Sequence, residues 1–282
     1  ASIQHLTTDQ VVALPDSLLA ALTSDQVPRL VQGQIEALTT AQFSKLAVSS
    51  LQALTSNQTQ WIETADIAAL TTSQIGALQT MQLAGLTSDQ LSALENNDVK
   101  AIDPTRMGVF AWSQLTGLSS HDIQALSPDQ VAGIRPQTLG LFSTEALAAL
   151  QTDDFAKLQT DQLRALTTVQ VQSLGSDSLI ALTTSQISVL RTDQIRALLT
   201  EQVAALQSQD FRAMITEQLT VLATDQVRAM ESSDFAGLEQ FQVAALGDLH
   251  RVGQRLRIVL EALRHFLLRE EVALRREVSR PP

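Results

Sequence analysis

The chain of 282 residues contains no cysteine and no tyrosine, and few other aromatic residues. Without cysteine it can form neither disulfides nor thiolate metal sites, so its core must be built from leucine, valine, isoleucine and alanine. Its apolar runs are far too short to span a bilayer. The segment from Ala1 to His5 lacks the basic and apolar regions of a signal peptide. We therefore expect a soluble chain without a membrane span, and the lack of cysteine is compatible with export.

Basic residues are scarce over most of the chain. The net charge is −11, and residues 247–282 contain eight arginines against five acids, a local charge of +3. Residues 1–246 therefore carry −11 − 3 = −14. Such an acidic surface repels nucleic acids and anionic lipids. The charge balance predicts that nucleic acid is not a partner.

The sequence repeats every eight residues from Leu6 to Leu246 without an insertion or deletion. We number the positions of each octad from 1 to 8, beginning at Leu6. Position 1 is Leu, Ile, Phe or Met in every octad, and position 6 is apolar in 29 of 30 octads, Thr59 being the exception. A fixed short period indicates a repeat architecture in which each unit contacts mainly its neighbours.

Neither a continuous helix nor a strand fits this period. Eight residues of α-helix turn by about 800°, which leaves the apolar stripe spiralling by about 80° per octad. In a strand, positions 1 and 6 would point to opposite faces. The octad therefore predicts a short helix that ends and restarts once per repeat.

Capping signals locate the start of each helix. Position 5 is Gln in 18 octads and Asp in 6. With Thr or Ser at position 2 as N-cap, this Gln is the third helical residue, and the pair forms a capping box. The apolar residues at positions 1 and 6 then form a hydrophobic staple. Pro104, Pro128 and Pro136 all occupy position 3, the first helical position, where proline is favoured.

A competing signal comes from position 3, which is Thr or Ser in 21 octads, against 11 octads at position 2. The cap is therefore expected to shift by one residue in many units. Position 8 is Ala or Gly in 21 octads, which would allow neighbouring helices to approach closely. Helices this short are marginal in water alone, so stacking must stabilise them. We predict an all-α fold: a superhelical solenoid of about 30 eight-residue short-helix repeats over residues 1–246, with a longer C-terminal helix over 247–282.

The C-terminal segment has a different periodicity. Its apolar residues step by three and four, which is typical of a coiled-coil seam, and are Leu249, Val252, Leu256, Val259, Leu263 and Phe266. Three roles remain open: a cap over the end of the solenoid, an oligomerisation helix, and a basic helix at a membrane surface. The oligomerisation reading predicts self-association through those six residues.

No arrangement of residues suggests catalysis. The four histidines have no ligand spacing, most hydroxyls are assigned to caps, and the glycines form no phosphate loop. Position 4 is acidic in 12 octads, and acids in a first helical turn interact favourably with the helix dipole. We expect no enzyme activity, no metal and no cofactor.

Position 7 varies most and is where a recognition surface could lie. In the second half of the chain it carries Arg164, Arg196, Arg212 and Arg228. Three of these arginines follow an aspartate by three residues, which favours local ion pairs on a solvated face. The alternative is a basic stripe that binds an acidic protein partner.

Two resemblances are carried by short motifs. The segment 126–134, LSPDQVAGI, looks like the helix opening of TAL-effector repeats, but the second helix, the base-reading loop and the basic charge of those repeats are missing. Over residues 6–246 the tandem A-L-T-T-x-Q-[VIL] units resemble octad arrays of long repetitive proteobacterial proteins, which are labelled adhesin-like or haem-utilisation-like. No haem ligand pair stands out in this chain.

These observations favour a non-enzymatic spacer module of a bacterial surface or exported protein. The resemblance implies the exported or cell-surface location, and the uniform octads favour a structural role. The alternative is a recognition solenoid that binds a protein or peptide in its superhelical groove, which the diversity at position 7 favours.

Overall fold

The computed structural model describes residues 3–247, and the six residues expected to form an oligomerisation seam lie outside this range. All regular structure in the described range is helical, with no strand, which confirms the predicted fold class. Contacts divide the chain into two compact units, residues 1–150 and 151–282. The octad repeat runs through both units, so the expected division at residue 246 stays a prediction.

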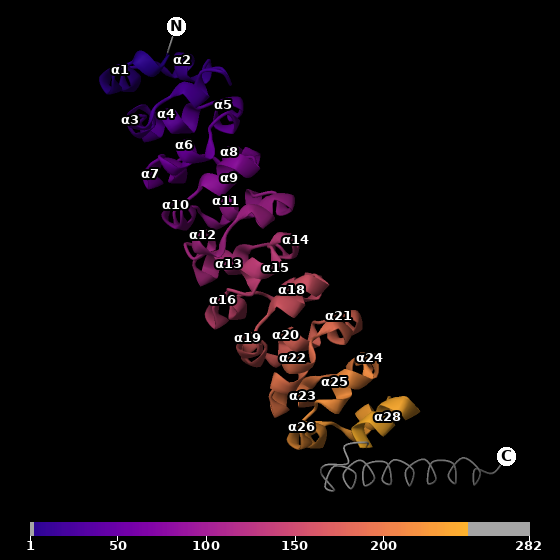
Figure 1. The fold of residues 1–282 in the computed structure, drawn as a ribbon. Helices are drawn as coiled ribbons and strands as arrows, with labels where there is room; N and C mark the ends of the chain where they lie inside the picture. The colour runs from indigo at the N-terminus through magenta and orange to yellow at the C-terminus, as the bar shows by residue number, and fades with distance from the viewer. Residues whose placement is uncertain (1–2, 248–282) are drawn as a thin grey trace, which may run out of the picture. The chain divides into compact units, whose positions relative to one another are not determined.

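Unit 1 contains short helices, nearly all of four to six residues, whose bounds follow chain order (Figure 1): η1 (Ile3–His5), α1 (Thr8–Val12), α2 (Asp16–Ala20), η2 (Val27–Arg29), α3 (Gln32–Glu36), α4 (Thr40–Lys45), α5 (Val48–Gln52), α6 (Ser56–Gln60), α7 (Thr64–Ala68), α8 (Thr72–Ala77), α9 (Thr80–Gly85), α10 (Ser88–Ser92), α11 (Asn96–Ala101), η3 (Pro104–Val109), α12 (Trp112–Leu115), α13 (Ser120–Ala125), α14 (Pro128–Gly133), α15 (Pro136–Leu139) and α16 (Thr144–Ala148). Unit 2 contains, up to residue 247, α17 (Thr152–Lys157), α18 (Thr160–Ala165), α19 (Thr168–Ser173), α20 (Ser176–Ile180), α21 (Thr184–Val189), α22 (Thr192–Ala197), α23 (Thr200–Ala205), α24 (Ser208–Ala213), α25 (Thr216–Thr220), α26 (Thr224–Ala229), α27 (Ser232–Ala236) and α28 (Gln240–Gly247).

The helix start is fixed in nearly every octad. The N-cap lies at position 2, in extended conformation, whether it is Thr7, Glu63 or Gln159. The expected shift of the cap to position 3 is therefore wrong. In most octads the backbone N–H of position 2 donates to the side chain of position 5, an interaction that needs no hydroxyl at the cap and supports the same register. In α18, for example, the N–H of Gln159 donates to Gln162 Oε1 at 2.7 Å.

Prolines agree with this register and explain the irregular octads. Pro128 and Pro136 begin α14 and α15 as predicted, and Pro104 begins η3. Pro28, at position 7, lies inside the expected helix, and its octad forms a turn followed by the 3₁₀ helix η2. Because proline has no N–H, the α-helical hydrogen bond at that residue cannot form.

Helices pack against the helix three octads away in the chain. The packed pairs within unit 1 include α4 with α7, α6 with α9 and α8 with α11, and those within unit 2 include α21 with α24 and α25 with α28. Each of these pairs begins 24 residues apart, as Ser56 and Thr80 do. The chain therefore winds within each unit so that successive turns of three octads stack as in a solenoid.

The core of each unit consists of the two apolar ladders at positions 1 and 6. Leu163 and Leu166 are fully buried. Thr59, the polar exception at position 6, is also buried, and its hydroxyl donates to the carbonyl of Thr55 at 3.1 Å. This bond satisfies the hydroxyl within its own helix, so the core accepts it.

Candidate functional site

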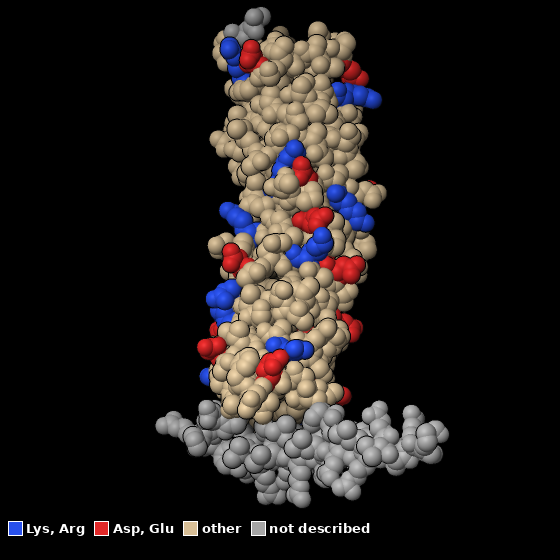
Figure 2. Space-filling view, turned by 90° about the vertical axis from the view of Figure 1, so that its right-hand side faces the viewer, with Lys and Arg blue, Asp and Glu red and all other residues tan. Residues whose placement is uncertain are grey.

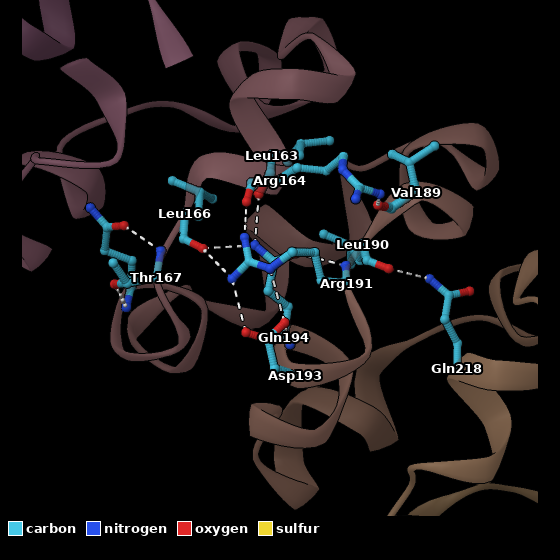
Figure 3. Close-up of polar contacts among 11 residues, drawn as sticks. Leu163, Arg164, Leu166, Thr167, Val189, Leu190, Arg191, Asp193, Gln194 and Gln218 are labelled. Carbon is cyan, nitrogen blue, oxygen red and sulfur yellow. Dashed lines mark hydrogen bonds and ion pairs between the residues drawn. The ribbon is translucent and has the colours of Figure 1, made fainter. Parts of the chain in front are cut away.

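Gln194 shows how one turn of the chain is joined to the next (Figure 3). Its Oε1 accepts the backbone N–H of Arg191 at 2.8 Å, which caps α22. Its Nε2 donates to the carbonyls of Leu163 at 2.7 Å and Leu166 at 2.8 Å, residues 31 and 28 positions earlier. Leu163 lies in the last turn of α18, and Leu166 follows that helix. One side chain therefore caps the start of one helix and the end of another.

The same arrangement recurs along both units, and we call these buried position-5 side chains the glutamine ladder. Outside this buried set, the half-buried Gln114 donates from Nε2 to the carbonyl of Leu86, 28 residues earlier, at 2.7 Å. Thirteen members of the ladder make the same bond, and they are Gln34, Gln42, Gln58, Gln74, Gln82, Gln90, Gln130, Gln186, Gln194, Gln202, Gln218, Gln226 and Gln242. All thirteen are buried. Buried polar groups are costly without partners, so each glutamine saturates the carbonyls that helix ends leave open.

Other donors replace glutamine at three octads of unit 1 and reach the same acceptor. Ser50 Oγ donates to Leu22 O at 2.9 Å. Thr138 Oγ1 donates to Phe110 O at 3.4 Å, and the Arg106 guanidinium donates to Leu78 O at 2.5 Å. The acceptor carbonyl is 28 residues earlier in every case. The hydrogen bond from position 5 to the preceding turn is therefore kept although the donor side chain differs. Among these substitutes, Arg106 belongs to the 3₁₀ helix η3.

Aspartate at position 5 has no proton to donate when ionised, and it takes a different partner. Asp98 accepts from Thr72 Oγ1 at 2.7 Å, and Asp234 accepts from Ser208 Oγ at 2.8 Å. Both hydroxyls are at position 3, 26 residues earlier. Position-3 hydroxyls therefore serve as partners for the ladder acids in these turns.

Burial raises the pKa of three of these acids. Desolvation is the largest cause for Asp66, Asp154 and Asp210, and it outweighs hydrogen bonds that lower the pKa, such as the one from Thr40 to Asp66. A buried carboxylate is disfavoured in its charged form. Each of these carboxylates therefore takes up a proton more readily in the folded chain than an exposed aspartate does.

Replacing Asp66 with glutamine is expected to stabilise unit 1 at pH 7 by about 1 kcal/mol, because a neutral donor replaces a desolvated charge. The folded pKa of Asp66 is raised, so the native state binds the proton first and the parent gains stability as the pH falls through that pKa towards 3.8. The advantage of Asp66→Gln should therefore shrink on acidification. Urea unfolding of both proteins at pH 7 and pH 4 measures this, and an advantage that grows at pH 4 would contradict it.

The four arginines expected to form a basic stripe behave differently from one another. Arg228 pairs with Asp225 at 3.2 Å and Arg212 pairs with Glu239 at 3.1 Å, whereas Arg164 Nη1 donates to the carbonyl of Val189 at 3.2 Å. Arg196 is exposed. Figure 2 shows acidic and basic side chains interspersed on one face rather than gathered by sign. A partner site on these arginines stays a prediction.

Two of the three expected local ion pairs are replaced by other contacts. Asp193 pairs with Arg191 at 2.9 Å instead of with Arg196, and Arg164 reaches a carbonyl (Figure 3). Arg191 also donates to the carbonyls of Arg164 and Leu166. Helix spacing suggested pairs within one helix, but Arg191 occupies the N-cap and contacts the preceding turn. This contact could not be found from spacing alone.

Within residues 3–247, no group of three His, Cys, Asp or Glu side chains is placed to hold a metal ion. No helix in the same range is long and apolar enough to cross a membrane.

Comparison with known proteins identifies the repeat. The model of the ALTTAQ repeat family matches residues 59–96, 147–184, 178–208 and 203–240, in agreement with the predicted octad resemblance. A search of curated proteins gives no match.

Proposed function

Because these four stretches of the chain are ALTTAQ repeats, we propose that the chain is a non-enzymatic spacer module built by repetition. The observation that supports this most directly is the glutamine ladder. Its bonds reach backbone groups alone, namely the cap N–H three positions earlier and carbonyls 28 to 31 positions earlier, as Gln58 reaches those of Leu30 and Val27. Whole octads can therefore be added without changing the contacts of the others, which suits a module whose length is the useful property.

A lengthened protein provides the test. Duplicating residues 158–189, four whole octads, should raise the maximum dimension in small-angle scattering, and a second duplication should raise it by the same increment. The thermal melting profile should remain cooperative, because every new glutamine finds its acceptors. A 32-residue Gly-Ser insertion at the same place is the matched control and should give no fixed increment. Equal dimensions with and without the duplication would rule out the spacer.

The location belongs to the same proposal. The resemblance to long repetitive proteobacterial proteins supports a place in a bacterial surface or exported protein, and the absence of cysteine is compatible with it. Fusing the chain to a reporter that acts only outside the cytoplasm, within its native full-length gene, tests this. Reporter activity confined to the cytoplasm would contradict the proposal.

Self-association through residues 247–282 is proposed as the way in which such modules join. The six apolar residues of the expected seam support it, since Leu256 and Leu263 lie one heptad apart. The variant Leu256→Asp with Leu263→Asp should convert a dimer to a monomer in light scattering. The matched control is Arg257→Asp with Arg264→Asp, placed beside the seam. A parent chain that is already monomeric would contradict self-association.

A further inference from the structure

Trp61 occupies position 8, which is Ala or Gly in most octads. A small residue at position 8 packs against the residue 29 positions earlier, which is at position 3 of its own octad. At Gly85, for example, an added Cβ would collide with the backbone of Ser56. The corresponding residue for Trp61 is Gln32, and both side chains line one open cavity of about 580 Å³ in unit 1. The bulky indole therefore occupies a position where most octads have a small residue packed against the preceding turn. Trp61 is only partly buried.

Three acidic residues are among those that line this cavity. The charged side chains that line it are Glu36 from α3, Glu63 at the cap of α7 and Asp89 from α10. No lysine or arginine lines it. Gln32 Nε2 donates to Glu36 Oε1 at 2.7 Å, which holds that carboxylate at the cavity. The Trp61 cavity thus combines an aromatic ring with unneutralised negative charge.

An aromatic ring and carboxylates together favour a cation that has an apolar or planar body. A bare metal ion does not fit, since no three of the acids in the described part of the chain are close enough to share one. A guanidinium or ammonium side chain can contact the ring by its face and the carboxylates by its N–H groups. The acidic charge of the array adds long-range attraction for a basic partner.

We propose that the Trp61 cavity binds an arginine or lysine side chain presented by a basic polypeptide segment. The cavity is open to the surface, so the segment can lie across α3, α7 and α10 with one cationic side chain inserted against Trp61. This assigns to unit 1 a recognition site separate from the position-7 arginines, and it does not depend on the spacer role.

The test uses the full chain with hexa-arginine as probe and hexa-citrulline, its uncharged analogue, as the control ligand. In the Trp112→Phe variant Trp61 is the remaining tryptophan, so its fluorescence reports the site and should change saturably with hexa-arginine alone. In calorimetry, Trp61→Ala should weaken binding at least tenfold. Alanine is common at position 8, so this variant should fold, and circular dichroism checks it.

A second variant keeps the proposal falsifiable if Trp61→Ala fails to fold. The triple variant Glu36→Gln, Glu63→Gln and Asp89→Asn should also weaken binding at least tenfold. The matched control removes three exposed acids elsewhere and is Asp9→Asn, Asp25→Asn and Asp161→Asn; it should retain binding within about twofold. Equal weakening by both triple variants would overturn the proposal, because it would show that hexa-arginine is attracted only by the overall negative charge. Full binding by a folded Trp61→Ala protein would also overturn it, because the indole would then make no contact with the ligand.

Discussion

Replacing Gln194 with leucine should lower the free energy of unfolding of unit 2 by about 2–4 kcal/mol, because three backbone groups each lose the hydrogen bond that this buried amide makes to them. These groups are the N–H of Arg191 and the carbonyls of Leu163 and Leu166, and Gln194 itself is fully buried. Leucine has a similar size, so the loss reports hydrogen bonding rather than a cavity.

Gln10→Leu is the matched control, since Gln10 occupies the same octad position in the first turn. Its Oε1 accepts the N–H of Thr7 at 2.9 Å, but the side chain is exposed and water can replace that bond. The control should change stability by no more than about 1 kcal/mol. Urea unfolding measures both variants, with hydrogen exchange to localise the loss to α18 and α22. Similar effects at the two positions would show that the contacts across turns contribute nothing beyond capping.

Gly85→Ala should destabilise unit 1 by about 1–3 kcal/mol, although alanine is the better helix former. A Cβ at Gly85 would overlap the backbone carbonyl of Ser56, which cannot move without shifting α6. None of the described residues has a positive φ angle, so the requirement is for space rather than for glycine's conformational freedom. The two packed helices would have to separate.

Gly33→Ala is the control for this prediction, because Gly33 is also helical and its added Cβ would meet only Thr8 Cγ2, at 4.0 Å. Here alanine should stabilise the protein by about 0.5–1 kcal/mol. Melting temperatures of the two variants should therefore move in opposite directions. A Gly85→Ala protein that melts at or above the parent temperature would refute the close packing of α6 on α9.

The helix start could be predicted to within one residue because its signals are local, although the hydroxyls at position 3 wrongly suggested a shift of the cap in many octads. Capping at position 2, proline at position 3 and the apolar ladders all involve residues within one octad. The donation from Gln194 to Leu166 could not be predicted, since 28 residues of intervening chain decide whether the two meet. The contact of Arg164 with the carbonyl of Val189, and those of Arg191 with the carbonyls of Arg164 and Leu166, were missed for the same reason.

One signal in the sequence did indicate the second role of position 5. A capping box accepts either glutamate or glutamine as its third helical residue, yet position 5 is Gln in 18 octads and never Glu. Capping needs only an acceptor oxygen, which both residues have. The preference for glutamine over glutamate agrees with a use for the donor nitrogen, which is the part that reaches the preceding turn, whereas aspartates such as Asp98 and Asp234 accept a hydroxyl from that turn instead.

The constant spacing of the glutamine ladder also bears on how the chain folds. Every turn is closed by a contact of the same short sequence separation, so a longer array has no more distant contacts than a short one, and its relative contact order falls as octads are added.

Repetition has a cost, since a chain of near-identical octads can pair one octad out of step with little loss of stability. Octads such as the one with Trp112 differ from all others, and a pairing one octad out of step would separate Trp112 from Phe142, whose ring centroids lie 4.8 Å apart. Irregular octads therefore act as alignment marks that make one pairing of turns better than its neighbours.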